Sequence, residues 1–331
     1  MKVRFLARLI PAVLTPLILA SCHSGDPIGS GPPLPQWTTI ASGSLDYLNS
    51  VWGSSASDVW SVGGAGNAGV IIRYDGTKWA THWSSTSLGT AWFLGGIWGA
   101  SPSDVWAVGA SAGAGGTLHY NGTAWSIVPS GTTQTLYNVW GTSASDVWAV
   151  GGSSAATVMH YNGTAWSTAL AGPTGVRFFA IWGTSPSNIW VVGTAGTIYH
   201  YDGTTWASAP SGTTDDIAGV WGSSVSDVWA VGGSAAAPGG TGGRILHYNG
   251  TSWSSVSSAT VRDLYGVWGS SASDVWAMGS YGTIVHFDGT SWTSKTSSGT
   301  SLFLGGAWGS SATDVWAVGG SGTIIHGPPT G

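Results

Sequence analysis

The stretch GSSVSDVWAVGG at residues 222–233 recurs with small changes along most of the chain. Its most regular marker is the pair Trp-Gly, which here is Trp221 followed by Gly222. The seven copies of the pair lie 39 to 47 residues apart, and their tryptophans are Trp52, Trp98, Trp140, Trp182, Trp221, Trp268 and Trp308. A period of this length indicates a fold built from equal units, either a propeller or a solenoid.

Each copy is predicted to hold four short strands. An apolar segment ending in W-G is followed by a Ser-rich turn, D-V-W-A-V-G, a Gly-rich loop, G-T-I-x-H-Y-[DN]-G-T and x-W. Apolar and polar residues alternate with a period of two, which is typical of β-strands. Asn-Gly and Asp-Gly pairs between these segments favour type I′ hairpin turns. Those pairs begin at Asp75, Asn121, Asn162, Asp202, Asn249 and Asp288. Four strands per repeat predict the blade of a β-propeller, whereas β-solenoid coils are shorter.

The two ends of the repeat region complement each other. The seventh copy stops after residues 322–326 without its fourth strand, and residues 36–40 form a fourth strand that no earlier strands precede. We therefore expect an all-β, seven-bladed propeller over residues 36–327, closed by the N-terminal strand around Trp37, with a tail at 328–331. Closure removes the open edge of a linear array of sheets.

The first residues have the pattern of an export signal. Lys2, Arg4 and Arg8 precede an apolar run at residues 9–20, and small residues follow. This pattern predicts a secretory signal peptide at residues 1–21 rather than a part of the fold.

Residues 19–22, LASC, resemble the bacterial lipoprotein box, which implies that Cys22 becomes the lipidated first residue of the mature chain. The alternative is an ordinary signal peptide with an incidental cysteine. Cys22 is the only cysteine, so an internal disulfide is excluded. Residues 22–35 are rich in Gly and Pro and are expected to act as a tether to the membrane. His23 after the lipid site implies an outer-membrane location in Gram-negative lipoproteins.

The charge balance excludes some partners. The formal net charge is −5, and all 14 acidic residues are Asp. Without the three leader cations, only six basic residues remain, so the surface is poorly suited to nucleic acid. We expect a monomer without a cofactor.

An aspartate recurs after a Ser or Thr and before V-W in most copies. Its members are Asp58, Asp104, Asp146, Asp227, Asp274 and Asp314, with Asn188 in the fourth copy. A short acceptor at a turn hydrogen-bonds nearby backbone N–H groups. The alternative is a functional ring of carboxylates, but an amide at position 188 cannot replace an essential carboxylate.

A histidine also recurs, at His119, His160, His200, His247, His286 and His326, with Arg73 in the first copy. Equivalent positions lie one blade apart, and no copy supplies a second His or a Cys as a metal ligand. We therefore predict a hydrogen bond to the recurrent Asp or to the backbone, and no metal site.

Positions that change between copies mark a candidate ligand site. Five residues before the W-G tryptophan stand Tyr47, Phe93, Thr135, Arg177, Asp216, Asp263 and Phe303. Three residues before it, Tyr137, Phe179 and Tyr265 add further aromatic rings. Aromatic faces beside Arg and Asp suit a sugar, through stacking and hydrogen bonds to hydroxyls. The alternative is a solvated ring of loops without a ligand.

The repeat motif, D-V-W-A-V-G followed by G-T-I-x-H-Y-D-G-T-x-W, resembles the tectonin-type repeat over residues 36–327. S-x-S-D-V-W is similar to the Asp-box, or BNR, repeat, and tandem copies behind a lipobox are found in bacterial, notably myxobacterial, lipoproteins. Tectonins are lectins for bacterial surface glycans, so the resemblance implies carbohydrate binding. Asp-box sialidases use three arginines with Glu and Tyr, and this chain has no Glu.

These observations predict a membrane-anchored, noncatalytic binding protein for a surface glycan or an envelope protein. A structural scaffold in an envelope or fibre assembly is the alternative. A glycoside-acting enzyme, using Asp216 and Asp263 as its two carboxylates, is a third possibility.

Overall fold

The computed structural model describes residues 37–328 except 66–67, 89, 235–241 and 296–299. Cys22, the predicted leader and tether, and residues 329–331 of the predicted tail lie outside the described residues. No helix in the described ranges is long and apolar enough to cross a membrane.

The strands form seven four-stranded antiparallel sheets. Blade 1 has β2 (Leu48–Ser55), β3 (Asp58–Ala65), β4 (Ala68–Tyr74) and β5 (Trp79–Ser84); blade 2 has β6 (Trp92–Ser101), β7 (Asp104–Ser111), β8 (Ala114–Tyr120) and β9 (Trp125–Ile127). Blade 3 has β10 (Leu136–Ser143), β11 (Asp146–Gly152), β12 (Ala155–Tyr161) and β13 (Trp166–Thr174); blade 4 has β14 (Phe178–Ser185), β15 (Asn188–Gly193), β16 (Ile198–Tyr201) and β17 (Trp206–Ser208).

Blade 5 has β18 (Asp216–Ser224), β19 (Asp227–Gly233), β20 (Arg244–Tyr248) and β21 (Trp253–Val256). Blade 6 has β22 (Leu264–Ser271), β23 (Asp274–Gly279), β24 (Ile284–Phe287) and β25 (Trp292–Lys295). Blade 7 has β26 (Leu304–Ser311), β27 (Asp314–Gly319), β28 (Thr323–Gly327) and β1 (Thr38–Ala41). Short 3₁₀ turns lie at η1 (Ser85–Leu88), η2 (Thr194–Gly196), η3 (Ser280–Gly282) and η4 (Gly320–Gly322).

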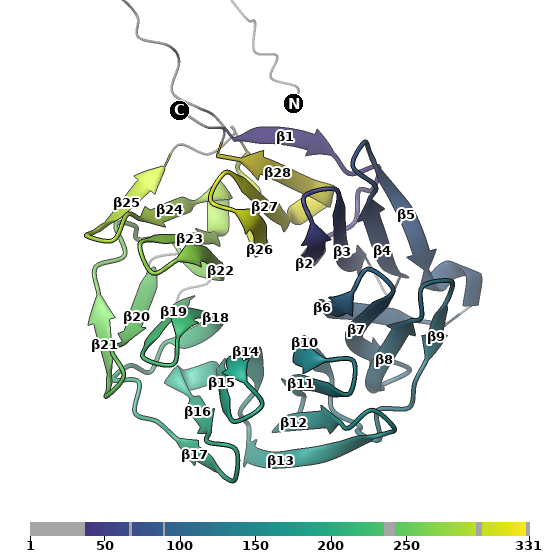
Figure 1. Cartoon of the computed structure of the whole chain (residues 1–331), viewed down its shortest axis with the longest axis horizontal. Coiled ribbons are helices and arrows are strands. Elements are labelled where there is room, and N and C mark those ends of the chain that lie inside the picture. Colours follow the sequence, from purple (N-terminus) through teal and green to yellow (C-terminus); the bar gives the residue numbers. More distant parts are fainter. Residues whose placement is uncertain (1–36, 66–67, 89, 235–241, 296–299, 329–331) are drawn as a thin grey trace, which may run out of the picture. The chain divides into compact units, whose positions relative to one another are not determined.

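The sheets surround a central channel, with the first strand of each blade innermost (Figure 1). Each inner strand contacts the inner strand of the next blade, and β26 contacts β2 to complete the circle. The predicted seven-bladed propeller of four-stranded blades is confirmed.

The ring closes through β1, as the sequence predicts. β1 pairs antiparallel with β28, from Thr38 opposite His326 to Ala41 opposite Thr323. Trp37, directly before β1, is buried and makes an edge contact with Trp276 of blade 6, with 5.3 Å between ring centroids. The strand therefore joins the first described residues of the chain to its last blade.

The Trp-Gly pairs interlock neighbouring blades. Each tryptophan ring lies over the glycine of the pair in the next blade, so that a Cβ on Gly99 would be 2.5 Å from Cη2 of Trp52. The seventh contact places Trp308 against Gly53 and so runs across the closure. Real Cβ atoms do not approach so closely, and glycine is required here by space rather than by backbone conformation.

A second tryptophan, in D-V-W, also packs across the blade boundary. Trp106 of blade 2 is buried and contacts Tyr161 and Trp166 of blade 3, at centroid distances of 4.7 and 5.3 Å. Equivalent aromatic contacts link the other blades, and burial of such rings removes a large apolar area from water. The predicted tryptophan core between blades is confirmed.

The recurrent His and Asp are structural partners. Nε2 of His160 donates to Oδ1 of Asp146 at 2.7 Å, and its ring stacks on Trp148 at a centroid distance of 3.9 Å. The same hydrogen bond joins His119 to Asp104, His247 to Asp227, His286 to Asp274 and His326 to Asp314. In blade 4 the equivalent hydrogen bond joins His200 to Asn188. In blade 1, Arg73 replaces the histidine and bonds Asp58. The hydrogen-bond prediction is confirmed; among the described residues, no group of three His, Cys, Asp or Glu is placed to hold a metal.

Truncation of the closing tryptophan tests the ring. We expect Trp37→Ala to lower the free energy of unfolding by about 3–5 kcal/mol, because it empties a buried site at the junction. Ile127→Ala, at a side chain that is 58% exposed, is the control and should change it by less than about 0.5 kcal/mol. Denaturant unfolding measures both, and equal losses would contradict closure by this strand.

His200 tests the polar link. Burial holds the pKa of His200 below its ordinary value, and Asp202 opposes the shift. The unfolded chain therefore takes up the proton first, and the free energy of unfolding contributed here falls as pH drops below about 6.5. Asn188→Asp places a carboxylate beside Nε2 and should raise the pKa of His200, whereas Asp202→Asn should lower it further. NMR titration measures both shifts, and an unchanged pKa in Asn188→Asp would contradict the assigned hydrogen bond.

Candidate functional site at the channel mouth

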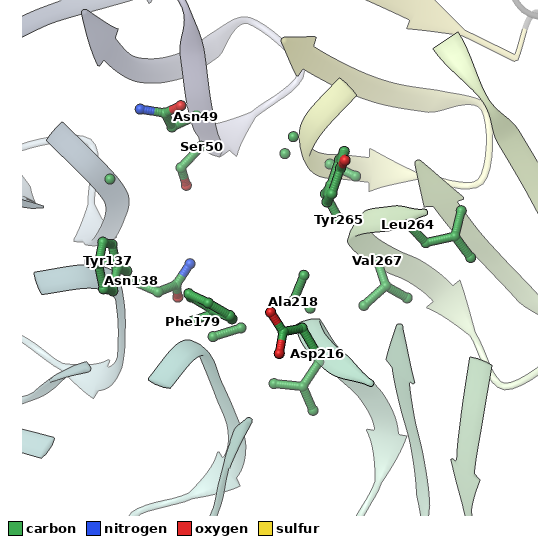
Figure 2. A pocket seen from close by; sticks show the side chains of 18 of the residues that line it. Asn49, Ser50, Tyr137, Asn138, Phe179, Asp216, Ala218, Leu264, Tyr265 and Val267 are labelled. Atoms are coloured by element: carbon green, nitrogen blue, oxygen red, sulfur yellow. The ribbon is translucent and has the colours of Figure 1, made fainter. Parts of the chain in front are cut away.

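A cavity of about 530 Å³ occupies the central channel. Residues from the inner strands of all seven blades line it, and Figure 2 shows Tyr137, Phe179, Asp216 and Tyr265 around it. The loops before the inner strands and the loops between the second and third strands lie on one face of the ring, here named the upper face. Hydrogen bonds join these two sets of loops, as from the N–H of Thr194 to the carbonyl of Arg177 at 3.0 Å.

A β-bulge in every inner strand produces one variable position per blade. In β10 the pairing passes from Leu136 opposite Gly151 to Asn138 opposite Val150, which leaves Tyr137 out of the ladder. The same shift occurs in all seven blades, and a bulge re-aims the side chain of its extra residue. The bulged residues are Asn49, Gly95, Tyr137, Phe179, Ala218, Tyr265 and Gly305.

The aromatic side chains form two arcs. Tyr137 makes edge contacts with Phe93 and with Phe179, at centroid distances of 6.2 and 5.9 Å, and all three line the cavity. Across the ring, Tyr265 contacts Phe303 at 6.4 Å, and Phe303 stacks on Tyr47 at 5.7 Å. Of this second arc only Tyr265 belongs to the cavity wall, while the Tyr47 side chain is 51% exposed on the upper face.

Asp216 lines the cavity from blade 5 and also supports blade 4. Its Oδ1 accepts a hydrogen bond of 2.9 Å from the N–H of Ala195 in η2. Ala195 has a φ of 53°, in the left-handed region, and this bond helps to hold the turn. The Asp216 side chain therefore has a structural partner as well as access to the cavity.

Asp263, directly before β22, is a buried carboxylate at the same wall. Its side chain is only 7% exposed, and its Oδ1 has no hydrogen-bond partner among the described residues. That oxygen lies against Gly233, where a Cβ would be 2.1 Å away. Because Gly233 pairs with Asp216 in the blade 5 ladder, Asp216 and Asp263 both lie beside Gly233 at the boundary between blades 5 and 6.

Among the described residues of the cavity wall there is no Lys, Arg or His. Two cations near blades 5 and 6 are engaged elsewhere: Arg244 bonds Asp215 at 2.5 Å, and the Arg262 guanidinium lies 4.3 Å from the Tyr281 ring centroid. Burial, together with the charge of Asp263 and the proximity of Tyr281, raises the pKa of Tyr265. Its hydroxyl therefore stays protonated and able to donate at neutral pH.

The structure brings six of the nine predicted ligand residues into the wall: Phe93, Tyr137, Phe179, Asp216, Asp263 and Tyr265. Tyr47, Arg177 and Phe303 lie outside it. Arg177 is exposed, and its backbone N–H bonds the hydroxyl of Thr194. Outside the wall, these three can contact only a ligand that extends beyond the cavity.

The wall also holds four polar residues that were not predicted from the sequence: Asn49, Ser50, Asn138 and Ser234. The Asn49 amide donates to the carbonyl of Leu94 at 2.8 Å and so bridges blades 1 and 2. The sequence contained a signal for two of them. Two residues before the W-G tryptophan, Ser50 and Asn138 are polar, whereas the other five copies have Gly or Ala there.

No protein-family model matches the chain, and no curated protein matches it. Solved structures do. YCF48 bound to a D1 peptide matches with a TM-score of 0.69 and 15% identity, over 91% of this chain and 100% of that one. Virginiamycin B lyase from Staphylococcus aureus matches with a TM-score of 0.71 and 12% identity, over 88% and 98%. The WD40 propeller of Doa1 matches with a TM-score of 0.66 and 11% identity, over 88% and 96%. At these identities the likeness shows the propeller fold alone.

Asp263→Asn tests whether the buried carboxylate destabilises the fold. We expect it to raise the free energy of unfolding by about 1 kcal/mol, because it removes a buried charge that lacks a partner. Asp216→Asn retains an acceptor for Ala195 and should change stability less. Denaturant unfolding at pH 7 compares the two, and a clear loss of stability in Asp263→Asn would show that the carboxylate has a structural role instead.

Proposed function

We propose that this chain is a noncatalytic binding protein that holds a cell-surface glycan in the channel-mouth cavity. The observation that carries the proposal is the composition of the wall. Three bulged aromatic residues, Tyr137, Phe179 and Tyr265, stand beside the amide of Asn138 and the carboxylate of Asp216.

This combination fits a saccharide better than an apolar ligand. Aromatic faces pack against sugar C–H groups, and amides and carboxylates bond hydroxyl groups. The Tyr265 hydroxyl adds a donor that stays protonated. The resemblance of the repeats to tectonins, which are lectins, supports the same ligand class.

A protein partner is the second candidate. Leu45, Tyr47, Phe93, Val261, Tyr281 and Leu302 expose between 40% and 89% of their surface. They lie in or beside the upper-face loops, and exposed apolar patches mark protein-binding sites. That YCF48 binds a peptide supports this candidate as a general use of the fold. The scaffold role predicted from the sequence would use the same surface.

The location proposed from the sequence is the cell envelope, with a lipid on Cys22 and residues 22–35 as a tether. Several buried acyl chains anchor a protein far more firmly than one, because each buried methylene contributes about 0.8 kcal/mol. Anchored in this way, the propeller could meet glycans of the envelope or of another cell. Mass spectrometry of the N-terminal peptide from membranes tests for the lipid.

A glycan array probed with residues 23–331 tests the proposed function. We expect binding that falls about tenfold or more in Tyr265→Ala, since removal of a stacking ring costs about 1.4 kcal/mol or more. Tyr47→Ala, on the same face but outside the wall, is the matched control and should bind normally.

Loss of binding in Tyr47→Ala but not in Tyr265→Ala would move the site to the exposed apolar residues. A blank array together with co-purification of an envelope protein, lost in Tyr47→Ala, would replace the glycan with the protein partner. Turnover of a glycoside abolished by Asp263→Asn would contradict the noncatalytic assignment.

A further inference from the structure

The wall of the channel-mouth cavity has an unbalanced charge. Asp216 and Asp263 contribute two carboxylates, and the described wall holds no cationic side chain. Neither carboxylate forms an ion pair in the described structure, whereas Asp215, next to Asp216, is paired with Arg244. The cavity is therefore an anionic site that lacks its counter-charge.

The surroundings of Asp263 show this charge imbalance most directly. A carboxylate this deeply buried, at 7% exposure, is normally paired or fully hydrogen-bonded, yet its Oδ1 has no partner in the described ranges. Gly233 leaves the room that this oxygen occupies, because any side chain there would displace it. The fold thus keeps a carboxylate at the wall that its own residues do not neutralise.

The aromatic rings of the wall also favour a positively charged ligand. Tyr265, Tyr137 and Phe179 surround the cavity, and aromatic faces attract organic cations through their quadrupoles. Figure 2 shows the carboxylate of Asp216 beside Phe179, with Tyr265 farther round the cavity. Two carboxylates with several rings form a suitable site for an ammonium group and repel carboxylate or phosphate groups.

We infer that the glycan bound in this cavity carries a positively charged amine, so that the ligand is an amino sugar that is not N-acetylated. The inference rests on the proposed function and narrows its ligand class. The ammonium lies beside Asp216, the charge of Asp263 within the wall favours it from behind, and the sugar ring packs on the aromatic residues. Sugars that carry carboxylate or phosphate groups are excluded by the same field.

A matched pair of oligosaccharides tests the charge requirement. Isothermal titration calorimetry of residues 23–331 compares the tetramer of β-1,4-linked glucosamine with the same tetramer fully N-acetylated, at pH 6, where an amine is protonated and a carboxyl ionised. We expect the glucosamine tetramer to bind at least tenfold more tightly, and the preference to shrink as salt is raised.

Variants assign the preference to the two carboxylates. Asp216→Asn with Asp263→Asn should weaken binding of the glucosamine tetramer by about tenfold to a hundredfold, the usual loss of a charged hydrogen bond, and weaken binding of the N-acetylated tetramer far less. Asp46→Asn is the control, because it removes the same charge from the upper face outside the wall. Unfolding of each variant in denaturant, measured in parallel, separates a loss of binding from a loss of fold.

The outcomes separate this inference from the proposed function. Equal affinity for the two tetramers, or tighter binding of the acetylated one, would overturn the amine while the glycan site stands. Binding of tetralysine in place of either tetramer, lost in the double variant, would overturn the sugar and assign the site to a basic protein. No binding of either tetramer, together with a blank glycan array, would overturn both proposals.

Discussion

The contact between the tryptophan of one blade and the glycine of the next is the constraint on which the rest of the structure depends. It occurs at all seven boundaries, and at Gly99 and Trp52 it leaves no room for a Cβ. Because the ring closes through Trp308 and Gly53, the geometry of each boundary is fixed by the other six. The buried aromatic contacts of the D-V-W tryptophans then stabilise the blades laterally, and β1 closes the sheet edge that would otherwise be open.

A frame that is repeated so strictly leaves the channel as the place where blades can differ. The recurrent Asp and His side chains bond each other, as at Asp146 and His160, and this occupies groups that could otherwise have been catalytic or metal ligands. The bulge in each inner strand has the opposite effect. It presents one side chain per blade that does not pair in the ladder, so tyrosine, phenylalanine, asparagine or glycine is accepted there without changing the fold.

The channel mouth also shows how stability and binding oppose each other in this fold. Asp263 is buried without a partner for Oδ1, which is unfavourable for folding. A positively charged ligand, as inferred above, would offset part of this cost. Apolar side chains on the surrounding upper face, such as Tyr47, are exposed outside the cavity wall, so one face offers two adjoining surfaces for recognition.

The number of blades, their four strands and the closing role of Trp37 could all be predicted from the amino-acid sequence, because each follows from a repeated local pattern. It also located most of the candidate site, since position-by-position comparison of the copies separates the constant frame from variable residues such as Tyr137 and Tyr265. Which of the variable residues face one cavity depends on how the blades pack, and that required the folded structure. Arg177 stands five residues before its W-G tryptophan, as Asp216 does, yet it lies outside the wall. The approach of Asp263 to Asp216 depends on the space left by Gly233 across a blade boundary, and contacts between blades are not encoded in the period of the repeat.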